Sequence, residues 1–303
     1  MTSGGPEPIR SEASSTVWIN GRLEPGDRAL LTVTDRGFQV GDGIFETLRV
    51  VGGRVLELPI HITRLQASAA VLAIPLPDDL GRLLGQAVWD VCTANRLDGP
   101  DTQVAVRVTV SRGAVEGRTL FPPDEVRPNL VVQAWRVDPP PPGLLSRGLH
   151  LAISGVRRDP ASPLATVKTT SRAEFVYAQL EAHRRGADDA LFLTTDGHLA
   201  EATSASLFLV EGVGLATPSL DCGILVSTTR RWVISCGGPG LGLPVRQGHL
   251  TPEHLFAADE AFLASSVAGI QPITSVDGRP IGAGTPGEWT LRLRALREDA
   301  TVV

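Results

Sequence analysis

Residues 137–143, with the sequence VDPPPPG, constrain the fold of this chain more than any other segment. Proline has a fixed φ and no backbone N–H, so this run can neither continue a helix nor pair inside a sheet. Such a run favours a stiff, extended connector between two folded units. We therefore predict a small N-terminal domain over residues 16–136 and a larger C-terminal domain over residues 144–303. The polar residues 1–15 precede both and are expected to form a disordered tail.

Strand and helix patterns occur on both sides of this connector, and they are mixed rather than strictly alternating. Apolar residues at every second position predict strands, and apolar residues at spacings of three and four predict helices. The mixture favours an α+β (mixed α/β) fold over a regular series of βαβ units. In the helix predicted at 172–185, one face carries Ala173, Val176, Leu180 and His183. The other predicted elements are strands at 17–23, 44–51, 54–58, 102–110, 129–135, 149–155, 190–193, 198–202, 207–210 and 260–263, helices at 59–72 and 79–94, an extended segment at 165–170, and a helix beginning at 228.

The composition excludes several classes of partner and cofactor. The net charge is −5, and the chain has no basic cluster of the kind that nucleic acids need. It also has no apolar run of about 18 residues that could span a membrane. The cysteines, Cys92, Cys222 and Cys236, are too scattered in sequence for a disulfide framework or a zinc pattern. We expect reduced thiols in a cytoplasmic protein, and no bound metal.

Lys168 is the only lysine in the chain, and arginine supplies the rest of the 28 Lys and Arg residues. Arginine stays protonated and cannot act as an amine nucleophile or a general base. Lysine can do both once burial or a nearby charge lowers its pKa. Lys168 is therefore a candidate for covalent amine chemistry through a Schiff base. The alternative is that an arginine-biased composition left one lysine by chance.

A lysine Schiff base with a pyridoxal cofactor needs an acid beside the pyridine nitrogen and a cup for the phosphate. Glu201 follows the predicted Asp196-Gly197 turn and could keep the pyridine nitrogen protonated. Phosphate is bound by hydroxyl groups, by arginine and by backbone N–H groups where a helix begins. Taken singly, each candidate is equally typical of a helix cap, a turn or an exposed strand. The candidates for the phosphate cup are Ser227, Thr228, Thr229, Ser265, Ser266 and Arg64.

Six segments that carry these residues occur in the order DRGFQVGDGIFETLRV, HITRL, ATVKTTSRAE, GADDALFLTTDGHLAEATSASLFLV, TPSLDCGIL–TTR and ADEAFLASSVAGIQPI. From about residue 17 to about residue 278, the chain resembles the class IV aminotransferase family, the fold-type IV pyridoxal-phosphate enzymes. The resemblance implies a pyridoxal 5'-phosphate cofactor between a small N-terminal α/β domain and a larger, mixed β-barrel-like C-terminal domain. It also implies a homodimer with its sites near the subunit interface. By position, Lys168 matches the Schiff-base lysine and Glu201 the partner of the pyridine nitrogen. The residues that match the phosphate ligands are Arg64, Thr228, Thr229 and Ser266.

Two positions depart from the family pattern. Ser206 stands where the family commonly has Asn, and Val226-Ser227-Thr228 replaces the usual Pro-Gly-Ile before the phosphate-binding threonine. The second change keeps the backbone donors and adds hydroxyl groups, so we expect phosphate binding to survive. Neither change removes a catalytic group.

The family contains branched-chain, D-amino acid and amine aminotransferases as well as 4-amino-4-deoxychorismate lyases. Branched-chain enzymes usually have Gly at the position of Thr47, and D-amino acid enzymes usually have Tyr at the position of Phe45. Phe45 cannot donate a hydrogen bond to a substrate carboxylate. The segments SRGAVEGR, residues 111–118, and KTTSRAE both resemble the lyases. This favours a lyase that forms 4-aminobenzoate and pyruvate, with Phe45 and Thr47 beside the substrate and Arg118 or Arg112 as a ligand of its carboxylate.

Other functions stay open at this point. One is an aminotransferase that acts on an amino acid or amine with a 2-oxo acid acceptor. Another is a catalytically silent member of the family, although Lys168, Glu201 and Arg64 are all retained. The last is a lysine-dependent aldolase without a cofactor, which would need no phosphate cup.

Overall fold

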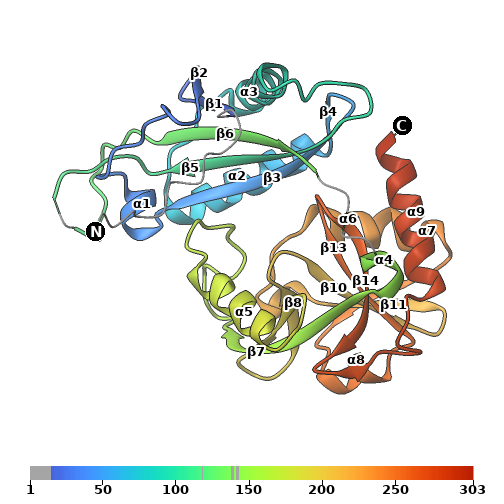
Figure 1. The fold of residues 1–303 in the computed structure, drawn as a ribbon. Helices are drawn as coiled ribbons and strands as arrows, with labels where there is room; N and C mark the ends of the chain where they lie inside the picture. Colours follow the sequence, from blue (N-terminus) through green and yellow to red (C-terminus); the bar gives the residue numbers. More distant parts are fainter. Residues whose placement is uncertain (1–14, 118, 138–139, 141–142, 303) are drawn as a thin grey trace, which may run out of the picture.

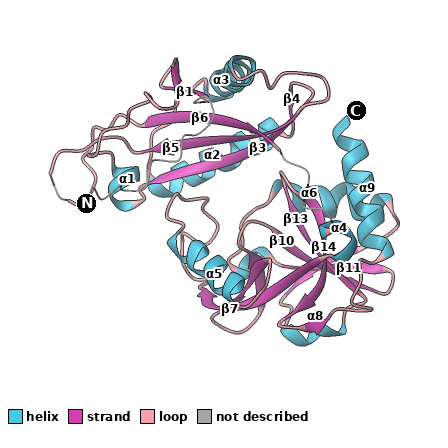
Figure 2. Ribbon diagram, in the orientation of Figure 1, coloured by secondary structure: helices cyan, strands magenta, loops and turns pink. Residues whose placement is uncertain are grey.

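The computed structural model describes residues 15–302, except residues 118, 138, 139, 141 and 142. The described strands form two β-sheets, one on each side of the proline-rich connector, with helices packed against both (Figures 1 and 2). None of the helices within these residues is long and apolar enough to cross a membrane. The mixed α/β architecture that the sequence predicts is confirmed.

The first sheet is antiparallel, with the strand order β2-β1-β6-β5-β3-β4. Two helices, α2 and α3, cover one face of this sheet (Figure 1). The elements are β1 (Thr16–Ile19), β2 (Arg22–Pro25), α1 (Arg36–Val40), β3 (Gly43–Val51), β4 (Arg54–Val55), α2 (Leu58–Leu72), α3 (Leu80–Ala94), β5 (Gln103–Ser111) and β6 (Asn129–Arg136).

The alternation of residues along β5 divides this sheet into an apolar face and a mixed face. Val104, Val106, Val108 and Val110 are buried in the core that the sheet shares with α2 and α3. Successive side chains of a strand point to opposite faces, so Arg107 lies on the other face. The same rule applies to β3, which is the antiparallel neighbour of β5. The face opposite α2 and α3, on which Arg107 lies, can therefore form one wall of a site.

The second sheet contains a closed ring of strands in the order β10-β13-β14-β7-β8-β9, because β9 also pairs with β10. Strands β11 and β12 extend the sheet beyond β10, and β15 pairs with β14. The barrel-like C-terminal half that the family resemblance implies is thus present. Its strands are β7 (Leu149–Arg158), β8 (Asp189–Thr194), β9 (Leu199–Ala202), β10 (Ser206–Glu211), β11 (Gly214–Pro218), β12 (Val245–Gly248), β13 (Glu260–Ser265), β14 (Gly269–Val276) and β15 (Arg279–Pro280). Its helices are α4 (Leu144–Arg147), α5 (Ala173–Arg184), η1 (Leu220–Cys222), α6 (Thr228–Trp232), the π-helix η2 (Val233–Gly237), α7 (Gly238–Gly240), α8 (Pro252–Ala257) and α9 (Glu288–Val302).

The loop that carries Lys168 joins the two halves of the molecule. The amide of Phe45 in β3 donates to the Lys168 carbonyl at 2.9 Å, and the Thr170 amide donates to the Gly43 carbonyl at 2.9 Å. Between them, Thr169 forms an isolated bridge with Ile44. Because β4 pairs only with the last residues of β3, the first residues of β3 have an edge free for this loop. The lysine is thereby fixed between the two sheets.

Most predicted strands and helices agree with the observed ones to within a few residues, but some predictions are wrong. Residues 165–170 form turns and the bridge to β3 instead of an extended strand. The strand predicted at 54–58 is limited to β4, because Glu57 adopts a left-handed conformation and α2 begins at the next residue. The predicted tail, apart from Ser15, and most of the connector lie outside the described residues, so the domain bounds stay a prediction.

The apolar face predicted for the helix at 172–185 is also wrong. Helix α5 buries Phe175, Ala178 and Ala182, whereas Val176 and Leu180 are exposed. The predicted helix is present, but its apolar residues lie on more than one side. Periodicity alone therefore could not determine which side packs against the sheet.

Candidate active site

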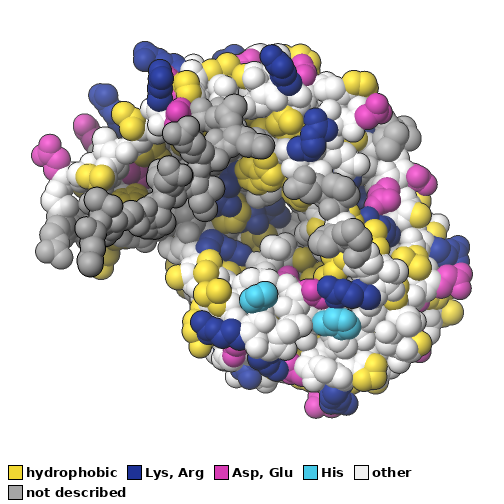
Figure 3. All heavy atoms as spheres, in the orientation of Figure 1, with side chains coloured by type: hydrophobic (Ala, Val, Ile, Leu, Met, Phe, Trp, Pro, Cys, Tyr) yellow, Lys and Arg dark blue, Asp and Glu magenta, His cyan; other side chains and the backbone are white. Residues whose placement is uncertain are grey.

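A cavity of about 470 Å³ lies between the two sheets and contains Lys168, Glu201 and Arg64 in its lining. Figure 3 shows the surface hollowed between the two halves, with basic and hydrophobic side chains inside the hollow. The three residues come from the loop before α5, from β9 and from α2. The further lining residues used below are Phe45, Thr47, Arg107, Trp135, Arg158, Arg172, Phe175, Leu225, Ser227, Ser265 and Ser266.

Lys168 lies above the aromatic ring of Phe45, with Nζ at 4.5 Å from the ring centroid. Burial lowers the pKa of its amine to about 8, and the positive charge of Arg64 acts in the same direction. Glu46 and Glu201 act in the opposite direction. A substantial part of the amine is therefore neutral near pH 8, which a nucleophile or a general base requires.

Glu201 lies on β9 with its carboxylate inside the cavity. The Leu225 amide donates to its Oε2 at 3.2 Å, and Arg158 Nη2 lies 3.5 Å from its Oε1. Burial raises the pKa of Glu201, while the charge of Arg158 and the Leu225 amide lower it. A protonated ring nitrogen placed beside this carboxylate would add a further positive partner and favour its ionised form.

Arg64 is held in place by a buried carboxylate. Its Nε and Nη2 donate to the two oxygens of Glu46 at 2.7 and 2.6 Å, and its Nη1 donates to the Val226 carbonyl at 2.9 Å. His61 Nδ1 lies 2.7 Å from the same Glu46 carboxylate. Burial opposes ionisation of Glu46, but the bonds from Arg64 and His61 outweigh it, and the pKa of Glu46 falls to about 2. The guanidinium is thus fixed beside the segment that begins α6.

Three consecutive residues with hydroxyl groups, Ser227, Thr228 and Thr229, lie at the start of α6, directly after the Val226 carbonyl that Arg64 binds. Ser227 Oγ accepts from the Arg230 amide at 3.1 Å as the N-cap, and Thr228 Oγ1 lies 3.1 Å from Ser266 Oγ. Thr229 Oγ1 is buried and has no hydrogen-bond partner among the described residues. A buried hydroxyl group without a hydrogen-bond partner makes the folded state less stable. An acceptor from a bound ligand would remove this penalty. With a fixed arginine and a helix start beside it, the site fits a phosphate group.

The opposite wall of the cavity belongs to the first sheet. Phe45 and Thr47 of β3 and Arg107 of β5 lie on the face opposite α2 and α3. The Arg107 guanidinium carbon lies 3.8 Å from the centroid of the Phe45 ring, and that of Arg172 lies 5.9 Å from the same centroid. Arg172 also stacks on Phe175 at 3.2 Å. Burial lowers the pKa of Arg172 to about 10, so its guanidinium is charged near neutral pH.

Of the predicted cofactor residues, Thr228 and Thr229 do not line the cavity, although Thr228 contacts Ser266, which does. The predicted cofactor residues that line the cavity are Lys168, Glu201, Arg64, Ser227, Ser265 and Ser266.

The predicted substrate arginines, Arg112 and Arg118, are not among the described lining residues. Arg112 donates to the Asp42 carboxylate and to the carbonyls of Leu72 and Ala73, and it does not line the cavity. Arg118 lies outside the described residues. Sequence reasoning missed Arg107, Arg172 and Trp135. A signal existed for Arg107, since it is the single charged residue within the alternating strand at 102–110.

Comparison with known proteins places the chain in a family. A family model described as amino-transferase class IV matches residues 43–276. A putative branched-chain-amino-acid aminotransferase of Methanocaldococcus jannaschii is 32% identical over 284 residues, covering 93% of this chain and 95% of the relative. The aminodeoxychorismate lyase of Bacillus subtilis is 30% identical over 280 residues, covering 92% of each protein.

Solved structures agree with this assignment. A branched-chain amino acid aminotransferase from T.th., solved with pyridoxamine 5'-phosphate, has a TM-score of 0.88 and 27% identity, over 96% of this chain and 95% of that one. The 4-amino-4-deoxychorismate lyase of Pseudomonas aeruginosa has a TM-score of 0.80 and 29% identity, over 94% and 99%. This chain therefore belongs to the class IV aminotransferase family of pyridoxal-phosphate-dependent enzymes.

Proposed function

We propose that this enzyme is a 4-amino-4-deoxychorismate lyase, which releases 4-aminobenzoate and pyruvate. The observation that carries the proposal is the pair of arginines, Arg107 and Arg172, around the Phe45 ring beside Lys168. The substrate of such a lyase has two carboxylates, one on its ring and one on its enolpyruvyl group. Two charged guanidinium groups in one small cavity complement such a dianion.

In this proposal the cofactor is held by residues from both halves of the molecule. Lys168 would bind it through Nζ, Glu201 would face its ring nitrogen, and Arg64 would neutralise its phosphate. The hydroxyl groups that would complete the phosphate site are those of Thr228, Thr229, Ser265 and Ser266. When bound, the cofactor supplies a place for the electron pair that remains after a C–H bond beside the substrate's amine is broken.

The protein's own part in the reaction centres on Lys168. Its neutral Nζ would take the proton from the carbon that bears the substrate's amine. The bond between the ring carbon and the enolpyruvyl oxygen then breaks, and the ring becomes aromatic. Protonation of the methylene carbon of the leaving group gives pyruvate, and the Lys168 ammonium can supply this proton. Arg107 and Arg172 would hold the two carboxylates during these steps.

A second candidate function is an aminotransferase that uses a dicarboxylate, such as glutamate with 2-oxoglutarate. The same arginine pair favours it, because both of these compounds also carry two carboxylates. The relatives named as branched-chain and D-alanine aminotransferases support transamination as the reaction, although their names mention no dicarboxylate. The early proton transfer by Lys168 is shared by the two reactions, so they differ in which bond breaks afterwards.

The discriminating experiment incubates the cofactor-loaded protein with 4-amino-4-deoxychorismate and follows 4-aminobenzoate by chromatography. Product formation that is lost in the Lys168→Ala variant supports the lyase. A yellow, cofactor-loaded protein that forms none, yet transfers an amino group from glutamate to a 2-oxo acid, supports the aminotransferase. If neither occurs with any amino donor, the protein is a silent member of the family. Activity that survives Thr229→Ala and Ser266→Ala without added cofactor points to the lysine-dependent aldolase.

We also propose that the enzyme is a homodimer. Large apolar side chains are exposed on and around α1, namely Leu30, Val33, Phe38, Leu120 and Phe121. Arg36 in α1 donates to the carbonyls of Thr119 and Leu120 and holds these segments together. An apolar surface of this kind is typical of a protein contact. Light scattering on the purified enzyme tests the proposal, and an active monomer contradicts it.

A further inference from the structure

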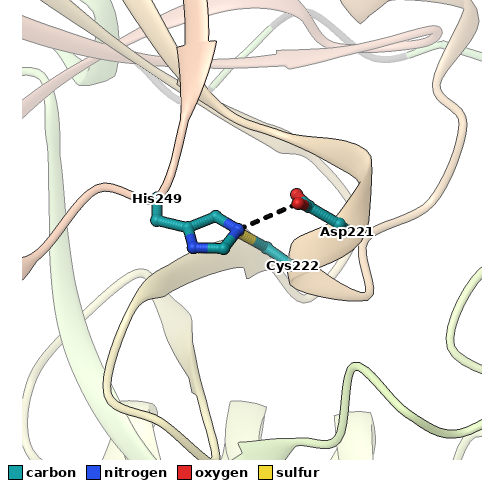
Figure 4. A group of neighbouring side chains, drawn as sticks. All are labelled: Asp221, Cys222 and His249. Atoms are coloured by element: carbon teal, nitrogen blue, oxygen red, sulfur yellow. Dashed lines mark hydrogen bonds and ion pairs between the residues drawn. The ribbon is translucent and has the colours of Figure 1, made fainter.

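A second group of reactive side chains lies outside the cofactor cavity. Asp221, Cys222 and His249 place a carboxylate, a thiol and an imidazole within 4.8 Å of one another (Figure 4). His249 Nε2 lies 3.0 Å from Asp221 Oδ2. Cys222 is buried, whereas Asp221 and His249 are exposed. None of the three lines the cofactor cavity.

The fold brings these residues together at one end of two neighbouring strands. Strands β11 and β12 are parallel, with Pro218 paired to Gly248, so the chain leaves both strands at the same edge. The Ser219 amide donates to the Gly248 carbonyl at 3.1 Å and fixes the two exits side by side. The next residues on each side are the turn η1, which holds Asp221 and Cys222, and His249. Backbone pairing therefore sets the distance between the two segments that carry the ligand atoms.

The surroundings of the group leave it open to solvent on one side. The His198 ring lies against the His249 ring with 4.9 Å between the centroids. Ser219 Oγ donates to Asp221 and lies 3.8 Å from Cys222 Sγ. The positive charge of Arg230 acts on Cys222, but this guanidinium is engaged by the Pro218 carbonyl and by Gln247. The group therefore has ordered partners around it and an exposed face through which a small ion can enter.

We propose that Asp221, Cys222 and His249 bind a divalent cation of the zinc class. A thiolate with an imidazole and a carboxylate is a donor set that suits zinc and disfavours magnesium or calcium. Bond lengths of about 2.0–2.3 Å to a tetrahedral zinc place its ligand atoms roughly 3.2–3.6 Å apart. The three ligand atoms already lie within 4.8 Å, so small side-chain rotations complete the site. A water molecule takes the fourth position.

The charges also favour this ion. An ionised Asp221 and a Cys222 thiolate carry two negative charges, which a divalent cation neutralises. Binding of the ion displaces the thiol proton, as is usual for cysteine ligands. Cys222 also packs among buried apolar residues such as Phe192 and Ile224, so its Sγ reaches the group from the apolar core.

Cobalt(II) is the probe of choice, because a cysteine-ligated tetrahedral cobalt absorbs in the visible range at longer wavelengths than the cofactor. We expect one equivalent of Co²⁺ to produce these bands in the holoenzyme and Zn²⁺ to remove them. Cys222→Ser and His249→Asn should each weaken binding by roughly hundredfold or more, since they remove direct ligands. Cys236→Ser, which replaces an exposed thiol outside the group, should leave the bands unchanged.

A second measurement guards against loss of fold in the Cys222 variant. His249→Asn and Asp221→Asn change exposed side chains, so both variants should fold and bind the cofactor normally. Zn²⁺ should raise the Tm of the wild-type holoenzyme by a few degrees and leave that of both variants unchanged. The absence of cobalt bands in the wild type, or bands that persist in His249→Asn, overturns the proposal.

Discussion

The two walls of the active-site cavity are built in different ways. The wall proposed for the cofactor takes its groups from the starts of helices and from the loops and strand ends of the barrel, with Arg64 reaching across from α2. The wall proposed for the substrate is one face of the first sheet, where Phe45, Thr47 and Arg107 project from neighbouring strands.

Because of this difference, we expect substitutions in the two walls to have different effects. The groups of the cofactor wall are fixed by specific hydrogen bonds, such as those from Arg64 to Glu46, so loss of one partner leaves another buried and unpaired. The groups of the substrate wall are positioned by strand register, and their side chains end in the cavity. We therefore expect changes in the first wall to affect stability and cofactor binding, and changes in the second to affect the choice of substrate.

The largest effect should come from the residue between the two walls. Lys168→Arg keeps a positive charge but removes the amine that can attack or take a proton, so activity should fall by roughly 10³–10⁴-fold or more. The measurement is kcat on the substrate that the wild type accepts, together with the absorption spectrum of the reconstituted protein. A variant that keeps more than a tenth of the wild-type rate would contradict the assignment of Lys168.

Glu46→Gln tests how strongly the cofactor wall depends on its buried ion pair. The fall of the Glu46 pKa from 4.5 to about 2 corresponds to roughly 3 kcal/mol of stabilisation by ionisation. Since the folded-state pKa is the lower one, this contribution is complete above about pH 4.5 and is lost as the pH falls towards 2. Urea unfolding should therefore show a gap of about 3 kcal/mol between wild type and variant at pH 7, narrowing in acid. A gap that does not depend on pH would contradict this explanation.

Arg107→Ala tests the substrate wall. It should raise the KM of a dicarboxylate substrate by roughly 10–100-fold, because a charged hydrogen bond contributes about 1.5–3 kcal/mol. Cofactor affinity should stay within roughly twofold of the wild type. Arg136→Ala is the matched control, since Arg136 is exposed on the neighbouring strand β6 and does not line the cavity. Equal effects of the two substitutions on KM would mean that Arg107 does not contact the substrate.

Thr229→Val should have the smallest effect and tests the phosphate cup. Removal of one hydrogen bond to the phosphate should weaken cofactor binding by roughly 5–30-fold, with little loss of stability, because Thr229 Oγ1 has no partner among the described residues. Thr217→Val provides the contrast: Thr217 is equally buried, but its hydroxyl donates to the Leu207 carbonyl at 2.8 Å. That variant should lose stability and keep its cofactor affinity. Equilibrium dialysis with the cofactor and thermal unfolding of both variants separate the two effects.

The sequence by itself determined much of the fold and the residues proposed to bind the cofactor. The spacing of apolar residues located most strands and helices, because this spacing depends only on residues within one element. Lys168 stands out as the only lysine in the chain. Glu201 and Arg64 stand out because they lie in short segments, DGHLAEATSASLF and HITRL, that resemble the class IV aminotransferase family.

Only the tertiary structure decided which distant residues meet. It placed Arg107 of the first sheet and Arg172, the N-cap residue of α5, around the ring of Phe45, gave Arg112 a structural role instead, and fixed the Lys168 loop against β3. It also brought His249 to Cys222, although the cysteines showed no metal pattern along the chain. These contacts depend on strand register and on where loops leave a sheet. Both are set by pairing between segments far apart in sequence, and the local signals of a single chain do not encode that pairing in a readable form.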